Sequence, residues 1–487
     1  MPILTNHGGD GLVETQCSLS TFEFQGIGGR DVVARFDGGR VTSDGGGIFL
    51  KEVEDRFGFV TQFAQCFTDY RDPNLIEHSL VDLLKQRIFA LCLGYEDLND
   101  HDSLRHDALL AVLVGKTDPE GLERIAPRDR GKALAGKSTL NRLELTPVRA
   151  DVDSRYKKVA ANLHAIQNFF IEAFLQQHPT PPARIVLDFD TTDDPVHGHQ
   201  LGRFFHGYYD EYCFLPLYAF CGDHPLLALL RPADIDGAAG AVKQLARIVE
   251  RIRQAWPDVK IVVRADSGFC REGLLRWCEE HGVDYVIGLA KNLRLIRALG
   301  KELHEASLEH RRTGLPARLF KDIEYRTHKS WSRSRRVIGK AEHLSKGANP
   351  RFVVTSLSAE EFDARTVYED EYCARGNMEN RIKEQQLCLF ADRTSCQTLR
   401  ANQLRLAFST VAYVVLRSLR EFGLKGTPLE KAQADTIRLK LLKIGAVIRV
   451  TVRKVWIALS NASPWQALFA RAYQQLTAWR QPFPNTA

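Results

Sequence analysis

Aspartates cluster at the end of one strand-like segment of the 487-residue chain, where metal-dependent chemistry would need them. The stretch "IVLDFDTTDDPVHG" spans residues 185–198 and contains Asp188, Asp190, Asp193 and Asp194. Side chains two residues apart in a strand point to the same face, so Asp188 and Asp190 share one face. Asp193 and Asp194 precede Pro195, where hydrogen bonding within a turn accounts for them. We therefore expect Asp190, at the strand's end, to be a metal ligand, with Asp188 as its competitor for that role.

A second strand-like segment, "VVRADSGF", ends in the same way at Asp266. In an α/β sheet, strand ends are where ligand-binding side chains emerge from a rigid base. If the two strands are neighbours, Asp190 and Asp266 raise each other's pKa, and a divalent cation removes that cost. Hard oxygen ligands of this kind suit Mg²⁺ or Mn²⁺.

A helical stripe supplies a third carboxylate, flanked by cations. In "EYCARGNMENRIKEQQ", positions i, i+3, i+7, i+11 and i+14 are Tyr372, Arg375, Glu379, Lys383 and Gln386. The plain interpretation is a solvated stripe in which i,i+4 ion pairs contribute a few tenths of a kcal/mol each. Next to two strand-end aspartates, Glu379 would instead complete a two-metal site, with Arg375 and Lys383 holding phosphate oxygens.

The elements that must position these residues follow from the periodicity. Strands are expected at 183–190, 212–220, 225–233, 259–266, 284–290 and 351–357, with helices at 239–256 and 270–282. Three strands followed by helix, strand, helix and strand indicate an α/β unit with a mixed sheet. Helical runs are expected near 74–94, at 145–178, from about 360, and at 399–422, and a terminal hairpin at 443–460 precedes a last helix.

Composition sets limits on the class of protein. Hydrophobic residues make up 44% and charged residues 26%, which is ordinary for a globular protein, and the length suggests about three domains. The net charge is only +6, but Lys and Arg crowd at 124–142, 330–340 and 438–454, which favours a nucleic-acid partner over three solvated faces. No apolar run reaches the roughly 20 residues of a membrane span. Ten cysteines without a CxxC pair indicate reduced thiols and a cytoplasmic protein.

The blocks "LDFDTTDD", "VVRADSGF" and "YCARGNMENRIKE" resemble the three catalytic blocks of the DDE transposases of bacterial insertion sequences. The resemblance is to the cut-and-paste branch with a Tyr-x2-Arg-x3-Glu signature and covers roughly 182–386. It implies catalytic, metal-binding roles for Asp190, Asp266 and Glu379, and DNA phosphate contacts for Tyr372 and Arg375. The longer signature has a lysine where this chain has Gln386, and Lys383 would have to supply that charge.

The resemblance also implies an architecture and partners. It implies an RNase H-like core with a mixed sheet, interrupted by a β-rich insertion and preceded by a helical N-terminal region. The corresponding regions are a DNA-end-binding region at 1–150, core parts at 151–290 and 352–425, a basic insertion at 291–351, and a C-terminal part at 426–487 for dimerisation or DNA contact. Two Mg²⁺ ions, with Mn²⁺ as substitute, would serve a homodimer acting on double-stranded DNA, both terminal inverted repeats and target. Such a protein would be cytoplasmic and associated with the nucleoid when bound to DNA.

Trp331 lies in the implied insertion among three arginines, Arg333, Arg335 and Arg336. Aromatic rings beside arginines can stack on an extruded base while the cations follow the phosphates. The alternative is a tryptophan in the small core of the insertion itself.

Two other functions remain open from the sequence. A metal-dependent nuclease of the same fold would cut DNA without joining it. A domesticated DNA-binding protein would have lost catalysis, which the presence of all three carboxylates disfavours. An α/β-hydrolase is not favoured, because the chain has no G-x-S-x-G elbow.

Overall fold

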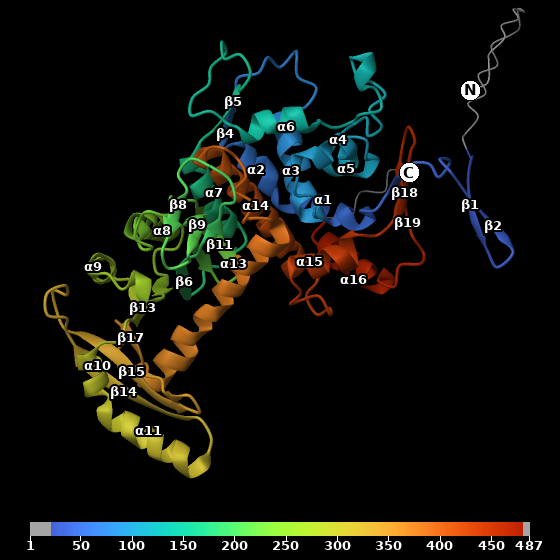
Figure 1. Ribbon diagram of the computed structural model, residues 1–487. Helices are drawn as coiled ribbons and strands as arrows, with labels where there is room; N and C mark the ends of the chain where they lie inside the picture. Colours follow the sequence, from blue (N-terminus) through green and yellow to red (C-terminus); the bar gives the residue numbers. More distant parts are fainter. Residues whose placement is uncertain (1–20, 481–487) are drawn as a thin grey trace, which may run out of the picture.

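The computed structural model describes residues 21–480, and within them the largest element is a nine-stranded mixed sheet (Figure 1). Its strands run in the order β11-β10-β6-β12-β13-β17-β15-β14, with β16 paired to β15. Their bounds are β6 Arg184–Thr191, β10 Leu217–Cys221, β11 His224–Leu229, β12 Lys260–Ala265, β13 Asp284–Leu289, β14 Ala317–Tyr325, β15 Arg335–Leu344, β16 Gly347–Ala348 and β17 Arg351–Thr355. The predicted α/β fold with a mixed sheet is confirmed.

The centre of the sheet combines both strand directions. β6, β10 and β11 form an antiparallel meander, whereas β6, β12 and β13 are parallel. The parallel strands need crossover connections, and α8 (Ala241–Ala255) and α9 (Glu272–Glu280) provide them. This confirms the predicted succession of three strands, helix, strand, helix and strand.

Each face of the sheet is buried by different helices. On one face, Ile185, Leu187 and Phe189 of β6 pack in a core that also includes residues of α7 (Leu163–Gln176), α8 and α9. On the other face, Val262 and Val286 pack against a helical run that begins at Ala364. The even-numbered residues of β6, including Asp188 and Asp190, point to this second face.

The helical run carrying Glu379 is irregular where the site residues lie. It consists of α12 (Ala364–Thr366), a π-helical turn (Val367–Tyr372), a 3-10 turn (Cys373–Arg375) and α13 (Gly376–Leu389). The prediction of a helix from about 360 is confirmed, but the ideal i, i+3, i+7 stripe is altered by the wide and tight turns. Such π-turns are often found at functional sites. In Figure 1 the orange run extends from the β14–β15 side of the sheet toward the helices at the other end of the molecule.

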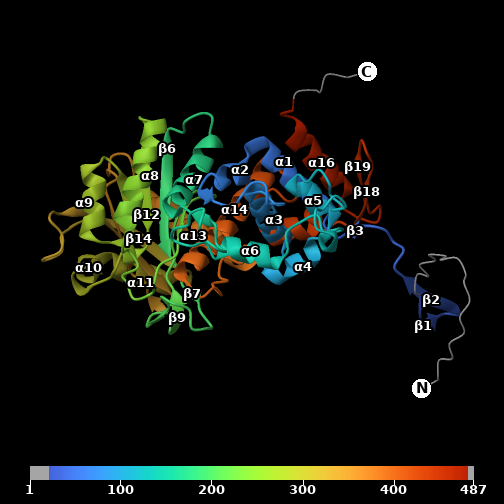
Figure 2. The same cartoon turned by 90° about the horizontal axis from the view of Figure 1, so that it is seen from above.

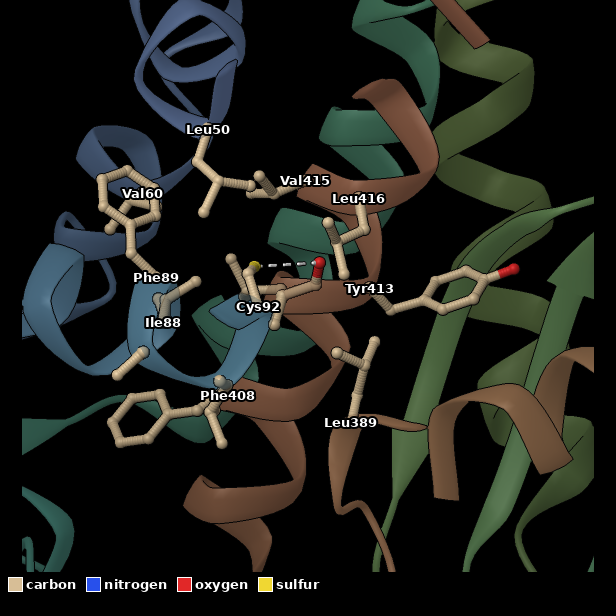
Figure 3. Close-up of a cluster of buried hydrophobic side chains, with 14 of the residues drawn as sticks. Leu50, Val60, Ile88, Phe89, Cys92, Leu389, Phe408, Tyr413, Val415 and Leu416 are labelled. Atoms are coloured by element: carbon tan, nitrogen blue, oxygen red, sulfur yellow. Dashed lines mark hydrogen bonds between the residues drawn. The ribbon is translucent and has the colours of Figure 1, made fainter. Parts of the chain in front are cut away.

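Those helices form a second body around α14, which we call the helical layer. It contains α1 Ile48–Phe57, α2 Phe59–Ala64, α3 Leu80–Leu93, α4 His101–Leu104, α5 Ala108–Val114, α6 Lys137–Glu144, α14 Leu399–Gly423, α15 Ala434–Ile437 and α16 Gln466–Thr477. Figure 3 shows Leu50, Ile88 and Cys92 of the N-terminal helices against Phe408 and Leu416 of α14. The Cys92 thiol donates to Ala412 O of α14 at 3.6 Å. The N-terminal helices and α14 therefore share one core.

Smaller elements complete the fold. They are the hairpin β1 (Thr21–Ile27) and β2 (Arg30–Arg35), the pair β4 (Phe67–Asp69) and β5 (Val159–Ala161), the sheet of β3 (Val41–Thr42), β18 (Ala446–Val450) and β19 (Val455–Leu459), the sheet of β7 (Asp194–Pro195), β8 (Phe204–His206) and β9 (Glu211–Phe214), and the helices α10 (Leu293–Ala298) and α11 (Gly300–Thr313). The β1–β2 hairpin stands away from the rest (Figure 2).

Two predictions need comment against these bounds. The predicted helix over 145–178 is wrong in its first half, because residues 159–161 form β5 and α7 starts only at Leu163, capped by Asn162. In the segment 291–351, for which an insertion is predicted, β15 pairs along β17 and so extends the large sheet. The first 20 residues of the predicted N-terminal region and the last seven of the C-terminal region lie outside the described residues.

Candidate active site at the carboxyl edge of the sheet

Asp190 and Asp266 lie at the ends of neighbouring parallel strands. β6 and β12 pair in a register that sets Asp188 beside Arg264 and Phe189 beside Ala265. Continuing this register by one residue sets Asp190 beside Asp266. The Asp266 carboxylate is fixed by its own turn, because Gly268 N donates to Asp266 Oδ1 at 2.9 Å. The two strands are neighbours, so the two aspartates lie together at this edge of the sheet.

Arg375 joins the third carboxylate to the first. Its Nη1 donates to Asp190 Oδ2 at 3.1 Å, and its Nη2 donates to Glu379 Oε1 at 2.5 Å. The side chains of Arg375 and Asp190 are 16% and 15% exposed, whereas that of Glu379 is 44% exposed. The guanidinium thus occupies the position between two carboxylates that a bound cation would neutralise.

The electrostatics of the site reflect burial and crowding. Burial raises the pKa of Asp190 to about 6; the charges of Asp266 and Glu379 raise it as well, and Arg375 opposes them. Burial lowers the pKa of Arg375, but Asp190 and Glu379 outweigh this and raise it overall. The ionised form of Asp190 is therefore stabilised by a nearby positive charge.

Tyr372 and the Asp266 turn lie close together because residue 288 is a glycine. A methyl group at Gly288 in β13 would lie 2.6 Å from Tyr372 Oη and 2.8 Å from Ser267 N. Only the absence of a side chain at Gly288 lets the tyrosine and the Asp266 turn approach the strand. Burial raises the pKa of the Tyr372 hydroxyl, which keeps it a neutral hydrogen-bond donor.

Asp188 has a structural partner. Arg264 Nε and Nη2 donate to Asp188 Oδ1 and Oδ2 at 2.5 Å and 2.7 Å, and Arg264 Nη1 donates to Glu371 O at 2.6 Å. This bidentate pair neutralises Asp188, whose pKa is raised by burial against the opposing effect of Arg264. Because both carboxylate oxygens are engaged, Asp188 serves here to hold the glutamate helix against the sheet.

Of the two remaining polar residues of the helical stripe, Gln386 is hydrogen-bonded within the protein and Lys383 is not paired with a carboxylate of the described residues. Gln386, which stands where the longer signature has lysine, donates from Nε2 to Asp193 O at 3.1 Å. Lys383 is exposed, and within residues 21–480 no carboxylate lies within ion-pair distance of it. The predicted pair of Arg375 with Glu379 forms, and Lys383 remains available to an external anion.

The arginines around Trp331 are largely paired with carboxylates of the protein itself. Trp331 is 4% exposed and packs edge-on against Tyr325 at 5.7 Å, with the Arg335 guanidinium 5.2 Å from its ring. Arg335 is buried between Glu272 and Glu279, each at 2.7 Å, and Arg333 also pairs with Glu279 at 2.7 Å. In this arrangement Trp331 offers no open face to a base.

Arg336 is likewise engaged within the protein. Its Nε donates to Asp322 Oδ1 at 2.5 Å, and its Nη1 donates to Leu357 O at 2.8 Å. Of the four residues predicted to bind DNA in this segment, Arg333 is therefore the most exposed, at 60%.

The donor set fits a divalent cation in its chemistry. Asp190, Asp266 and Glu379 offer the carboxylate oxygens that Mg²⁺ and Mn²⁺ prefer. Within residues 21–480, no three His, Cys, Asp or Glu side chains converge closely enough to hold a metal ion, and Glu379 is turned onto Arg375 instead. Arg375 therefore supplies the positive charge that Asp190 and Glu379 share.

Sequence reasoning missed two features of the site. Arg264, the partner of Asp188, is separated from it by 76 residues, and nothing local indicates the pair. The aromatic segment 202–214, "GRFFHGYYDEYCF", forms much of a small sheet next to the end of β6; its ring-rich composition was the available signal. Among the described residues, no helix is both long and apolar enough to span a bilayer.

Fold and site together define a mixed α/β protein with an acidic centre at the carboxyl edge of its sheet. The family model described as "Transposase DDE domain group 1" matches residues 24–481, so the chain belongs to this family of DDE transposases. Comparison with curated proteins gives no match. The cryo-EM structure of a piggyBac transposase synaptic complex with hairpin DNA is similar over 83% of this chain and 80% of that one, with 11% identity and a TM-score of 0.39.

Proposed function

We propose that the chain is the transposase of an insertion sequence, which binds transposon ends and catalyses phosphodiester hydrolysis and strand transfer in a cut-and-paste reaction. One observation carries the proposal: Asp190 and Asp266 lie at the ends of neighbouring strands, and Arg375 joins Glu379 to Asp190. That arrangement is what the "DDE" of the family would require of this sequence.

The proposal extends to the fold. We assign β6, β10, β11, β12 and β13, with their order 3-2-1-4-5 in the sheet, to an RNase H-like core spanning 151–290 and 352–425. We assign 291–351 to an insertion within it, 1–150 to recognition of the DNA ends, and 426–487 to dimerisation or DNA contact. The functional unit is a homodimer, because two ends must be brought together.

Each site residue has a distinct task in the proposed reaction. Two Mg²⁺ ions, or Mn²⁺, would be held by Asp190, Asp266 and Glu379, and would supply activation of the attacking hydroxyl and stabilisation of the leaving oxygen. Tyr372 donates its neutral hydroxyl to a phosphate oxygen, and Lys383 supplies the charge that Gln386 lacks. The attacking group is water in the first cut and a DNA 3′-hydroxyl in the joining step.

Arg375 changes partners in this scheme. In the free protein it neutralises Asp190 and Glu379, which would otherwise repel each other and Asp266. With a cation held by the carboxylates, the guanidinium would be free to donate to two non-bridging phosphate oxygens in a bidentate contact. The positive charge thus stays in the site and moves from the carboxylates to the DNA.

The test is DNA cleavage by the variants Asp190→Asn, Asp266→Asn and Glu379→Gln on labelled DNA that carries the flanks of the gene. Each substitution keeps the size of the side chain and removes a charge, so we expect cleavage to fall at least 100-fold, the order of an essential catalytic group. Asp370→Asn is the matched control, since Asp370 is exposed on the same helical run. Wild-type rates for Asp266→Asn or Glu379→Gln would refute the assignment.

Joining of the cut end to a target plasmid separates the transposase from a nuclease of the same fold. The transposase yields joined products, whereas the nuclease yields cut ends only. A protein that binds the ends but neither cuts nor joins them would be the domesticated form.

A further inference from the structure

A small sheet next to the end of β6 presents an unusual surface. β7, β9 and β8 pair in that order, and we call residues 194–214 the flap. β7 begins at Asp194, three residues after β6 ends at Thr191, so the flap continues from the edge of the sheet that carries Asp190. In Figure 2 the labels β7 and β9 mark the flap where it projects from the body of the molecule.

The outer face of the flap is built from aromatic rings. Phe205 of β8 and Tyr212 of β9 pair directly and so share a face, with 53% and 50% exposure, and Tyr208 in the turn between the two strands is 85% exposed. Phe205 and Tyr212 contact each other edge-on at 5.6 Å, and the Arg203 guanidinium lies 4.4 Å from the Tyr212 ring. On the opposite face, Cys213 is buried and pairs with Phe204, which is 41% exposed. A group of exposed rings this dense is uncommon on a protein surface without a ligand to cover it.

Direct contacts connect this surface to the candidate active site. Tyr209, whose ring packs against Tyr208 at 5.0 Å, donates its hydroxyl to Thr191 O at 3.4 Å, one residue after Asp190. On the other side, Gln386 of α13 donates to Asp193 O, immediately before the flap. The exposed rings are thereby held near the carboxylates by both the strand and the helix that carry them.

We propose that the flap binds unpaired nucleotides of the DNA strand next to the cut, by stacking bases on Phe205, Tyr208 and Tyr212 while Arg203 contacts the phosphates. This rests on the proposed function and names the form of DNA that the site holds. Rings with a neighbouring guanidinium are the combination that binds single strands without regard to sequence. The site that cleaves a strand must receive it within reach of Asp190, and the flap is the aromatic surface continuous with that site. The flap, and not Trp331, is then the stacking element.

Cross-linking tests the proposal on the full-length protein. The probe is a duplex with a single-stranded thymidine tail, in which one tail thymidine is replaced by 5-iododeoxyuridine, which cross-links to stacked aromatic rings under near-ultraviolet light. Binding is measured in Ca²⁺ to prevent cleavage. We expect the cross-linked peptide to lie within 202–214, and the cross-link to disappear when the analogue is moved into the paired region.

Affinity gives a second readout. Phe205→Ala/Tyr208→Ala should bind the tailed duplex about tenfold or more weakly per lost ring, with unchanged affinity for the blunt duplex. The matched control is Tyr156→Ala, which removes a ring that is 60% exposed outside the flap and that also has a guanidinium, that of Arg155, 4.9 Å from it. Because all three rings are exposed, both proteins should keep the wild-type melting temperature.

The outcomes separate the two proposals. Equal loss on both probes, no loss, or a cross-link outside the flap overturns the stacking role while wild-type cleavage leaves the transposase assignment intact. If the wild type neither binds nor cuts either DNA, the proposed function fails and the stacking role fails with it.

Discussion

At the residue scale, the geometry of the candidate active site depends on Gly288 having no side chain. A Cβ atom at Gly288 would meet Tyr372 Oη at 2.6 Å and Ser267 N at 2.8 Å, and the second neighbour is backbone that cannot easily move. We predict that Gly288→Ala displaces the Asp266 turn and Tyr372, lowers DNA cleavage at least tenfold and costs about 1–3 kcal/mol in the free energy of unfolding. Cleavage assays and urea unfolding measure the two effects.

The control for this prediction is Gly273→Ala in α9, where nothing lies within 4 Å of the added methyl group. Alanine is the better helix former by about 0.8–1 kcal/mol, so this variant should be as stable as the wild type or more so, and fully active. Equal activity of the two variants would mean that Gly288 does not position the site.

The residues of the site were predictable to the extent that their signals are local. Asp190, Asp266 and Glu379 each occur at a recognisable place, a strand end or a helix face, and two of the three could be placed together by reasoning about neighbouring strands. The partner of Asp188 could not be found in this way, because Arg264 becomes its neighbour only through the β6–β12 register. The bridging position of Arg375 depends likewise on how its helix packs on the sheet.

At the scale of elements, the β14–β15 segment shows how tertiary contacts change the meaning of a basic sequence. Its arginines appear as a DNA-binding patch in the sequence, but Glu272 and Glu279 of α9 and Asp322 of β14 neutralise them in the fold. The strands at 184–191 and 260–265 were predictable because their periodicity is local. The failed first half of the 145–178 helix has the opposite cause, since β5 forms by pairing with β4, far away in sequence.

Substitution of Trp331 tests whether the β14–β15 segment is structural. We predict that Trp331→Ala lowers the free energy of unfolding by about 3–5 kcal/mol, because it empties a buried site between Tyr325 and Arg335, and that Trp331→Phe costs less. At temperatures where Trp331→Ala is folded, its affinity for DNA should equal that of the wild type. Urea unfolding and fluorescence anisotropy with labelled DNA are the measurements.

Trp456→Ala in β19 is the control for the effect on stability. That indole is 53% exposed, so its removal leaves no cavity and should not lower the free energy of unfolding in the same way. A Trp331→Ala protein with unchanged stability and weakened DNA binding would restore the stacking role to Trp331.

At the scale of the whole molecule, a buried histidine makes the helical layer sensitive to acid. His101 is fully buried and shares a network in which Gln86 Nε2 contacts His101 Nδ1 at 3.0 Å and donates to Ala135 O at 2.8 Å. Burial, with the nearby charge of Arg87, lowers the His101 pKa from 6.5 to about 3. Below pH 6.5 the unfolded chain therefore takes up a proton that the folded chain refuses, and stability is lost as the pH falls toward 3.

The expected size of this effect is about 1.4 kcal/mol per pH unit below pH 6.5, or about 2 kcal/mol at pH 5. His101→Asn keeps an acceptor for Gln86 but cannot be protonated, so its loss of stability between pH 7 and pH 5 should be smaller by that amount. His106→Asn, at an exposed histidine nearby, should behave as the wild type does. Urea unfolding at the two pH values decides, and identical pH dependence in all three proteins would exclude His101 as the cause.

The cores of the molecule do not coincide with contiguous pieces of its sequence. The N-terminal helices pack on one another, but they also bury Leu84, Ile88 and Phe89 in a core shared with α14, some 320 residues later, so their core is incomplete within 21–150. The sheet core, by contrast, runs from Ile171 to Val354 and is built within one stretch of chain.

We predict that a fragment of residues 21–150 does not unfold cooperatively, whereas a fragment of residues 163–372 does, because only the second carries its own core. Thermal unfolding followed by near-ultraviolet circular dichroism distinguishes them, and adding residues 399–480 in trans should restore a cooperative transition to the first fragment. A cooperative transition of 21–150 alone would establish it as an independent domain.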